Sequence, residues 1–150
     1  MGGFLLDASA FAKTVLLEPG SHYVEELVSG AVAGPTTLVV LQIGFAEAVN
    51  AIWKRQQRGE IGPQQALEAH SRLVGLSEGL TLAEGLEYSR RSLEIAMAMN
   101  IAIYDALGVA CAEAEGLTLV TGDRRQAEVA ARLSPPVNVE LFTPANHSGV

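Results

Sequence analysis

A single carboxylate inside a long apolar stretch is the feature that most constrains this chain. Between residues 27 and 53 the only ionisable side chain is Glu47, and the next charge is Lys54. A carboxylate among apolar neighbours is costly to bury unless it is paired, protonated or bound to a metal. In the helix predicted over about Leu41–Gln57, Glu47 and Asn50 share one face. We therefore expect Glu47 to face the interior, with Asn50 one turn further on.

The aspartates are few and similarly placed. The chain has fourteen glutamates but only three aspartates, and each aspartate follows an apolar run: Asp7 in FLLD, Asp105 in NIAIYD and Asp123 in LTLVTGD. Each could cap a helix, worth ~1 kcal/mol, and Gln126 would complete a variant of the capping box. For one aspartate alone the cap is the preferred interpretation. The set, together with Glu47, favours convergence on one metal site.

The order of apolar runs and breaks predicts alternating strands and helices. Strands are expected at Gly3–Asp7, Thr36–Val40, Leu80–Leu82, Leu117–Thr121 and Val137–Phe142. Helices are expected at Ala8–Leu17, His22–Ser29, Leu41–Gln57, Gln64–Leu76, Glu84–Met99, Tyr104–Gly116 and Arg124–Leu133. This pattern predicts one α/β domain over residues 1–143, with a mostly parallel sheet covered on both faces, and a flexible tail at 144–150. Sites in such sheets lie beyond the carboxyl ends of the strands.

Composition supports a single folded domain and excludes several classes. Hydrophobic residues make up 49% and charged residues 18% of the 150 residues, as in globular proteins. The single Cys111 cannot form an internal disulfide and is expected to be a small buried hydrophobe. The N-terminus lacks a signal-peptide pattern, and polar residues interrupt the apolar stretch at 31–53. We therefore expect a cytoplasmic protein without a membrane span. The net charge of −7 argues against a broad basic surface for nucleic acid.

Four clustered carboxylates need a cation, because unneutralised they raise one another's pKa values. Oxygen ligands suit a hard ion such as Mg²⁺ or Mn²⁺. Zinc is disfavoured, since the cysteine and the three histidines, His22, His70 and His147, show no ligand spacing. One or two such ions can activate water and orient a phosphate in phosphodiester hydrolysis.

With these acids in this order, the chain resembles the PIN-domain family, particularly the VapC-like toxin ribonucleases of prokaryotic toxin–antitoxin pairs. The resemblance is carried by LLDASAFAK, by FAEAVNAIWK and by the long segment IYDALGVACAEAEGLTLVTGDRR. The segments agree with the family in order and spacing, from about Gly3 to Phe142. The resemblance implies a three-layer α/β/α sandwich. It also implies a metal-dependent endoribonuclease in which water attacks phosphorus without a covalent intermediate.

The resemblance also implies roles for individual residues. The four metal-binding and catalytic acids are Asp7, Glu47, Asp105 and Asp123. The polar residues expected to support them are Ser9, Asn50 and Thr121. Arg124 and Arg125, next to Asp123, are the preferred phosphate contacts. The other candidates are Lys13, Lys54, Arg55, Arg58, Arg90 and Arg91, and a solvated helix face is the preferred interpretation for most of the set. Gly122 departs from the family, which often has alanine there.

The expected partners are an RNA substrate, an antitoxin protein and a second copy of the chain. An antitoxin segment would insert an arginine or lysine among the acids and replace the charge of the metal. Alternatives are a PIN-like binding module without catalysis and an RNA-processing nuclease that is not a toxin. A phosphohydrolase of the haloacid dehalogenase type is disfavoured, because Ser9 stands where that class has a second aspartate.

Overall fold

Five parallel strands form the central sheet of the computed structural model, which describes residues 2–16 and 21–142. The strands are β1 (Gly3–Leu6), β2 (Thr37–Leu41), β3 (Thr81–Ala83), β4 (Thr118–Thr121) and β5 (Val139–Leu141). Their order across the sheet is β3-β2-β1-β4-β5, so the first strand lies in the centre. The mostly parallel sheet expected from the sequence is confirmed.

Successive residues of the central strands enter different cores, which explains their continuous apolar character. In β1, Leu5 belongs to the apolar cluster on one face of the sheet, and Leu6 belongs to the cluster on the other. In β4, Leu119 and Val120 divide in the same way. Because side chains alternate along a strand, a strand buried on both faces is apolar at nearly every position; the exceptions in β4 are Thr118 and Thr121.

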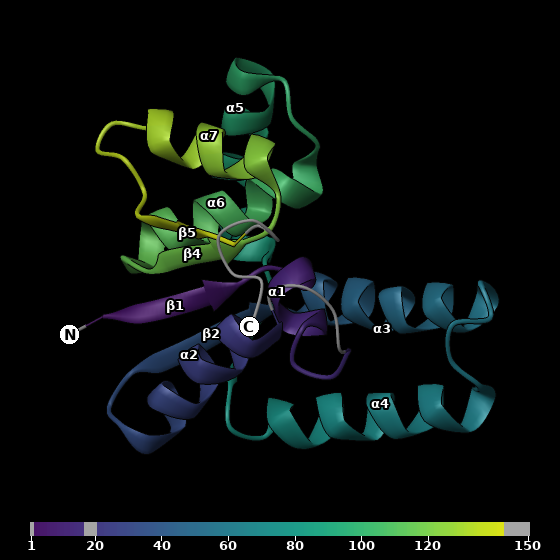
Figure 1. Cartoon of the computed structure of the whole chain (residues 1–150). Helices are drawn as coiled ribbons and strands as arrows, with labels where there is room; N and C mark the ends of the chain where they lie inside the picture. The colour runs from purple at the N-terminus through teal and green to yellow at the C-terminus, as the bar shows by residue number, and fades with distance from the viewer. Residues whose placement is uncertain (1, 17–20, 143–150) are drawn as a thin grey trace.

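Helices cover both faces and complete the predicted α/β/α sandwich. They are α1 (Ala8–Ala12), α2 (Ser21–Ala33), α3 (Gln42–Gln57), α4 (Pro63–Ser77), the 3-10 turn η1 (Leu86–Tyr88), α5 (Ser89–Met99), α6 (Ile103–Glu115) and α7 (Arg124–Arg132). Buried residues of α1 to α4 pack on one face of the sheet, and those of α5 to α7 pack on the other. Figure 1 shows the two groups on opposite sides.

Several element boundaries differ from the predictions. The first helix ends at Ala12 and continues as single turns to Leu16; the rest of the predicted segment lies outside the described residues. The second helix is longer than expected, from Ser21 to Ala33. The helix predicted at Glu84–Met99 begins later, with η1 at Leu86 and α5 at Ser89, because Gly85 adopts a φ of 101° and cannot continue a helical backbone. The predicted tail at 144–150 also lies outside the described residues.

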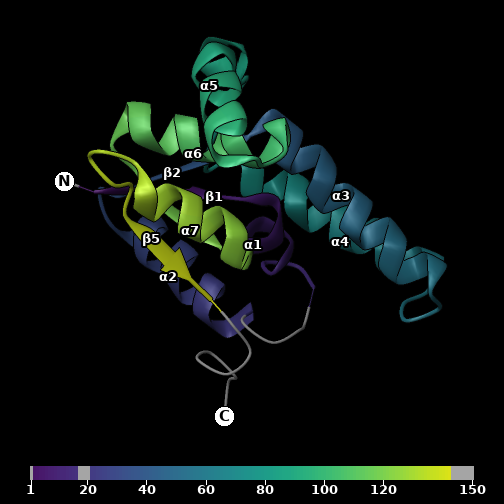
Figure 2. The same cartoon turned by 90° about the horizontal axis from the view of Figure 1, so that it is seen from above.

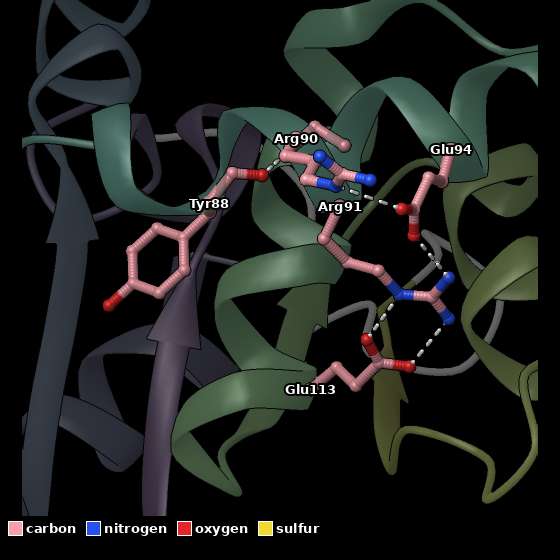
Figure 3. Close-up of polar contacts among 6 residues, drawn as sticks. Tyr88, Arg90, Arg91, Glu94 and Glu113 are labelled. Atoms are coloured by element: carbon pink, nitrogen blue, oxygen red, sulfur yellow. Dashed lines mark hydrogen bonds and ion pairs between the residues drawn. The ribbon is translucent and has the colours of Figure 1, made fainter.

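The pair of helices α5 and α6 is joined by a charged contact on its outer side. Arg91 of α5 donates two hydrogen bonds to Glu113 of α6, at 2.7 and 3.0 Å, and one to Glu94 at 3.3 Å (Figure 3). Such a fork fixes the relative orientation of two helices. Beneath it, Cys111 is fully buried beside Tyr88, and burial raises the pKa of its thiol to about 11. This residue is a core hydrophobe, as expected.

Among the described residues, no single helix has the length and apolar character needed to cross a membrane. The segments Leu86–Met99 and Ile103–Glu115 meet those criteria only as a pair, and this pair is bent by 117°.

Candidate functional site

The candidate site lies at the carboxyl edge of the sheet, beyond β1 and β4. These two strands are neighbours, but the chain leaves β1 toward β2 and reaches β4 only after β3 and the helices α5 and α6. The connections therefore diverge on the two sides of β1. A crevice forms at such a switch point in parallel sheets, and the first and last predicted acids flank it.

Asp7 directly follows β1 and caps α1. Its Oδ1 accepts a hydrogen bond from the backbone N–H of Ala10 at 2.8 Å and from the Ser9 hydroxyl at 2.6 Å. Its Oδ2 accepts from the Thr121 hydroxyl at 2.5 Å. Both predicted supporting hydroxyls therefore contact the same carboxylate, and together they fix its orientation.

Asp123 follows β4 and caps α7, accepting from the backbone N–H groups of Arg125 and Gln126. Its own backbone N–H donates to the Thr121 hydroxyl oxygen at 2.9 Å. Thr121 thus links the loops after β1 and β4 through one buried oxygen. The capping interpretation holds for Asp7 and Asp123, and the hydrogen bonds show that a cap can also face the crevice.

Asp105 is not a helix cap, so that interpretation is wrong for this residue. The cap of α6 is Ala102, and Asp105 lies in the first helical turn, where a carboxylate interacts favourably with the helix dipole. The backbone carbonyl of Asp105 accepts a hydrogen bond from Gln126 Nε2 at 2.9 Å. The predicted capping-box role of Gln126 is therefore also wrong, because its side chain crosses to α6.

Gln126 is a site residue that the sequence analysis missed. It is buried, and Gly108 makes room for it: a Cβ there would lie 3.0 Å from Gln126 Nε2. Its buried Oε1 has no hydrogen-bond partner among the described residues. Nothing in the sequence around Gln126 indicated this contact, because it joins residues 21 positions apart.

The four acids line one cavity of about 180 Å³, together with Tyr104 and Gln126. Burial raises the pKa of Asp7, and the charge of Asp123 raises it further against the hydrogen bonds that lower it. The pKa of Glu47 is raised by burial and then by the charges of Asp105 and Asp7. Burial and the charge of Asp123 raise the pKa of Asp105. The structure therefore brings together all four acids predicted from separate segments.

The donor chemistry of this cavity suits a hard divalent cation. It offers carboxylate oxygens and the unpartnered Oε1 of Gln126, without sulfur or imidazole. In the described part of the chain no three acidic, histidine or cysteine side chains are arranged to share one ion as they stand. Binding would thus require the acids to turn toward one another, which mutual repulsion opposes until a cation is present.

The two arginines predicted to contact phosphate lie at the start of α7 and are exposed. The guanidinium of Arg125 donates to the Met99 carbonyl at 2.6 Å and lies 4.0 Å from Glu128. This contact ties α7 to the end of α5. Arg124 and Arg125 do not line the acid cavity.

A steric constraint explains why position 122 is a glycine. A Cβ at this position would lie 2.8 and 3.1 Å from two ring atoms of Phe142, a buried residue just after β5. The Gly122 N–H also donates to the Ser9 hydroxyl at 3.1 Å. Glycine therefore allows the ring to lie under the loop that carries Asp123.

The fold and the cavity define a class: parallel α/β domains whose acidic residues converge at the switch point of the sheet. The PIN domain family model matches residues 4–132, and the chain belongs to this family. The resemblance stated from the sequence is confirmed.

Similar proteins support this assignment. Ribonuclease VapC3 of Pyrobaculum aerophilum is 30% identical over 132 residues, covering 88% of this chain and 98% of the relative. The crystal structure of PAE2754 from the same organism is 26% identical, with a TM-score of 0.66, covering 85% of this chain and 86% of that one. VapBC2 from Rickettsia felis, bound to a DNA fragment from their promoter, shares the fold at 17% identity, with a TM-score of 0.68, covering 94% and 99% of the two chains.

Glu47→Gln should stabilise the metal-free protein at pH 7. The raised pKa means that ionised Glu47 opposes folding, so stability falls as the pH rises from the ordinary value of 4.5 through the folded pKa. We expect a gain below about 1 kcal/mol, because the side chain is exposed, and the gain should shrink toward pH 4.5. Urea unfolding across pH measures it. Glu68→Gln on α4 is the matched control; an equal gain there would contradict the coupling.

Gly122→Ala should destabilise the fold by about 1–3 kcal/mol, because the added methyl group must displace a buried ring. Combining it with Phe142→Leu should cost less than the sum of the two single changes, since the steric conflict is then relieved. Gly75→Ala on α4, where a Cβ meets nothing within 4 Å, should be neutral or stabilising. Urea unfolding compares them, and additive effects would exclude the steric explanation.

Proposed function

We propose that this protein is a metal-dependent endoribonuclease that hydrolyses RNA phosphodiester bonds with a metal-activated water. The observation that carries the proposal is the convergence of Asp7, Glu47, Asp105 and Asp123 on one cavity at the carboxyl edge of the sheet. Membership in the PIN domain family and similarity to a ribonuclease support RNA as the substrate.

The four carboxylates would hold one or two Mg²⁺ or Mn²⁺ ions. Such an ion supplies charge neutralisation and lowers the pKa of a bound water. The chain itself supplies orientation: the hydroxyls of Ser9 and Thr121 fix both oxygens of Asp7. Gln126 anchors the backbone of Asp105, and its buried Oε1 offers an acceptor to a water in the cavity.

Ser9 also weighs against an aspartate-nucleophile mechanism. It donates its hydroxyl to Asp7, so the position where that class has a second aspartate carries a hydrogen-bond donor to the first carboxylate. Both oxygens of Asp7 already accept hydrogen bonds, from two hydroxyls and a backbone N–H, so both are engaged in supporting contacts.

We further propose that the protein is a toxin controlled by an antitoxin. The likeness in fold to VapBC2 of Rickettsia felis and to a sarcin-ricin loop cleaving toxin, VapC20 of Mycobacterium tuberculosis, which is 14% identical with a TM-score of 0.60 over 80% of this chain and 91% of that one, supports this role. A basic antitoxin side chain among the four acids would replace the charge of the metal.

Asp105→Asn should abolish metal-dependent cleavage, lowering kcat by at least about 100-fold, as expected for loss of an essential charged group. Cleavage of a mixed RNA pool, with Mn²⁺ or Mg²⁺ and with EDTA, measures this against the wild type. Glu68→Gln, a carboxylate change remote from the cavity, should leave cleavage unchanged. Cutting that persists in EDTA or in Asp105→Asn would refute the mechanism.

A second copy of the chain is the other proposed partner, and it would dock on an apolar face of α5. The exposed fractions are 50% for Leu93 and 70% for Met97 on α5, and 79% for Leu86 in η1 just before it. Arg90 and Glu94, an ion pair of the same helix (Figure 3), are three or four residues from these side chains and so share their helix face. In a two-fold arrangement of antiparallel α5 helices, Arg90 of one copy faces Glu94 of the other. The face is therefore complementary to itself in charge.

Leu93→Asp should convert a dimer into a monomer, because it places an uncompensated charge at the centre of that contact. Leu67→Asp is the control: this residue of α4 is 63% exposed but lies on the other side of the sheet. Sedimentation at micromolar concentration separates the outcomes. A monomeric wild type, or dissociation by Leu67→Asp alone, would rule out the α5 interface.

A further inference from the structure

A second cavity, of about 440 Å³, adjoins the acid cavity and shares Ser9 and Glu47 with it. It lies between α1 and α3, which run side by side in both views (Figures 1 and 2). Its volume is in the range of about 300–1,000 Å³ found for ligand pockets. It therefore extends the acid cavity in one direction along the two helices.

Two lysines, Lys13 and Lys54, line this second cavity. On α3, Glu47, Asn50 and Lys54 follow one another at spacings of three and four, so one helix face leads from the acids to a cation. On the facing side of the cavity, Lys13 is the C-cap residue of α1. The acidic groups of the first cavity and the lysine of α3 in the second cavity are therefore separated by about two helical turns.

Lys13 is oriented by the protein. Its Nζ lies 5.7 Å from the centre of the Phe142 ring, within the range of a cation–π contact, and the side chain is half-buried. The same ring leaves no room for a Cβ atom at position 122. The loop before Asp123, the buried ring and the lysine thus form one packed unit beside the acids.

A solvated helix face explains Lys54 less well than it explains many of the arginines. Arg55 and Arg58 bind Glu60, Arg91 binds Glu113, and Arg90 lies near Glu94. In contrast, Lys54 has no acidic partner among the residues that the structure describes, and its nearest acid along the helix face is Glu47.

A polyanion approaching four carboxylates needs cations close to them. We propose that Lys13, Asn50 and Lys54 form a nucleotide subsite that binds the backbone of single-stranded RNA next to the bond that is cut. The two lysines contact the neighbouring phosphate, and the Asn50 amide lies between them and Glu47 to bind the sugar or base. This inference rests on the proposed nuclease function and adds where the substrate strand runs.

The test separates binding from cleavage. An oligoribonucleotide without secondary structure is titrated, with Mg²⁺ present, against Asp105→Asn and against the same variant carrying Lys13→Ala and Lys54→Ala. The slope of log affinity against log salt should become shallower by about 0.7 for each phosphate that the protein no longer neutralises. Arg132→Ala, which removes an exposed cation at the end of α7 that lines neither cavity, should leave the slope unchanged.

Steady-state cleavage gives the second readout. With Asp105 intact, the double lysine change should raise KM about tenfold and alter kcat less than twofold, because the two lysines bind the strand away from the reacting atoms. Lys54→Arg should retain most of the affinity, since binding a phosphate here needs chiefly the charge. Lys54→Ala alone guards against misfolding, because this exposed helical site favours alanine.

The outcomes are distinct from those for the nuclease itself. An unchanged slope and KM in the lysine variants would overturn the subsite while the wild type still cuts RNA. A wild type that cuts nothing would refute the nuclease, yet the salt slope would still report on the subsite. Lysine changes that weaken binding of a poly-glutamate peptide but not of RNA would assign the cavity to an acidic protein partner and overturn the proposal.

Discussion

The burial of carboxylates beside one another is the constraint on which the rest of this structure depends. Burial is the largest cause of the raised pKa values of Asp7, Glu47 and Asp105, and the charge of another acid adds to each of them. A fold holding such a cluster must offset its cost elsewhere. The apolar clusters on both faces of the sheet do so, since they bury side chains of the central strands on each side. The parallel arrangement is what brings these acids to one edge.

The hydrogen bonds around the cavity hold the acids by different means. Asp7 is fixed through its side chain by two hydroxyls, whereas Asp105 is fixed through its backbone by Gln126. Glu47 is exposed on α3, so the expectation that it faces the interior is wrong, although it does line the acid cavity. The cluster therefore has rigid members next to β1 and β4 and a more exposed member on a helix. An ion could draw the exposed carboxylate inward without disturbing the strands.

The predictable part of the fold rests on patterns that are local in sequence. Uninterrupted apolar runs such as those around Leu5 and Val120 indicated strands buried on both sides, and each lies in the sheet. The acids were found because aspartate is rare here. The inferences that failed concerned details set by packing between distant segments. The cap of α6 at Ala102 has no side-chain signature, and the bond from Gln126 to Asp105 requires α6 and α7 already packed together.

The net negative charge of the chain affects the approach of a polyanion differently at long range and close to the cavity. A net charge of −7 repels a polyanion at long range, and at physiological salt that repulsion is screened beyond about 8 Å. Binding is then decided by charges in the immediate surroundings of the cavity. Lys13 and Lys54 lie there, whereas Arg125 is engaged with Met99. A cation that neutralises the acids would leave these lysines as the dominant local charge, so metal loading and attraction for a phosphate backbone would be coupled.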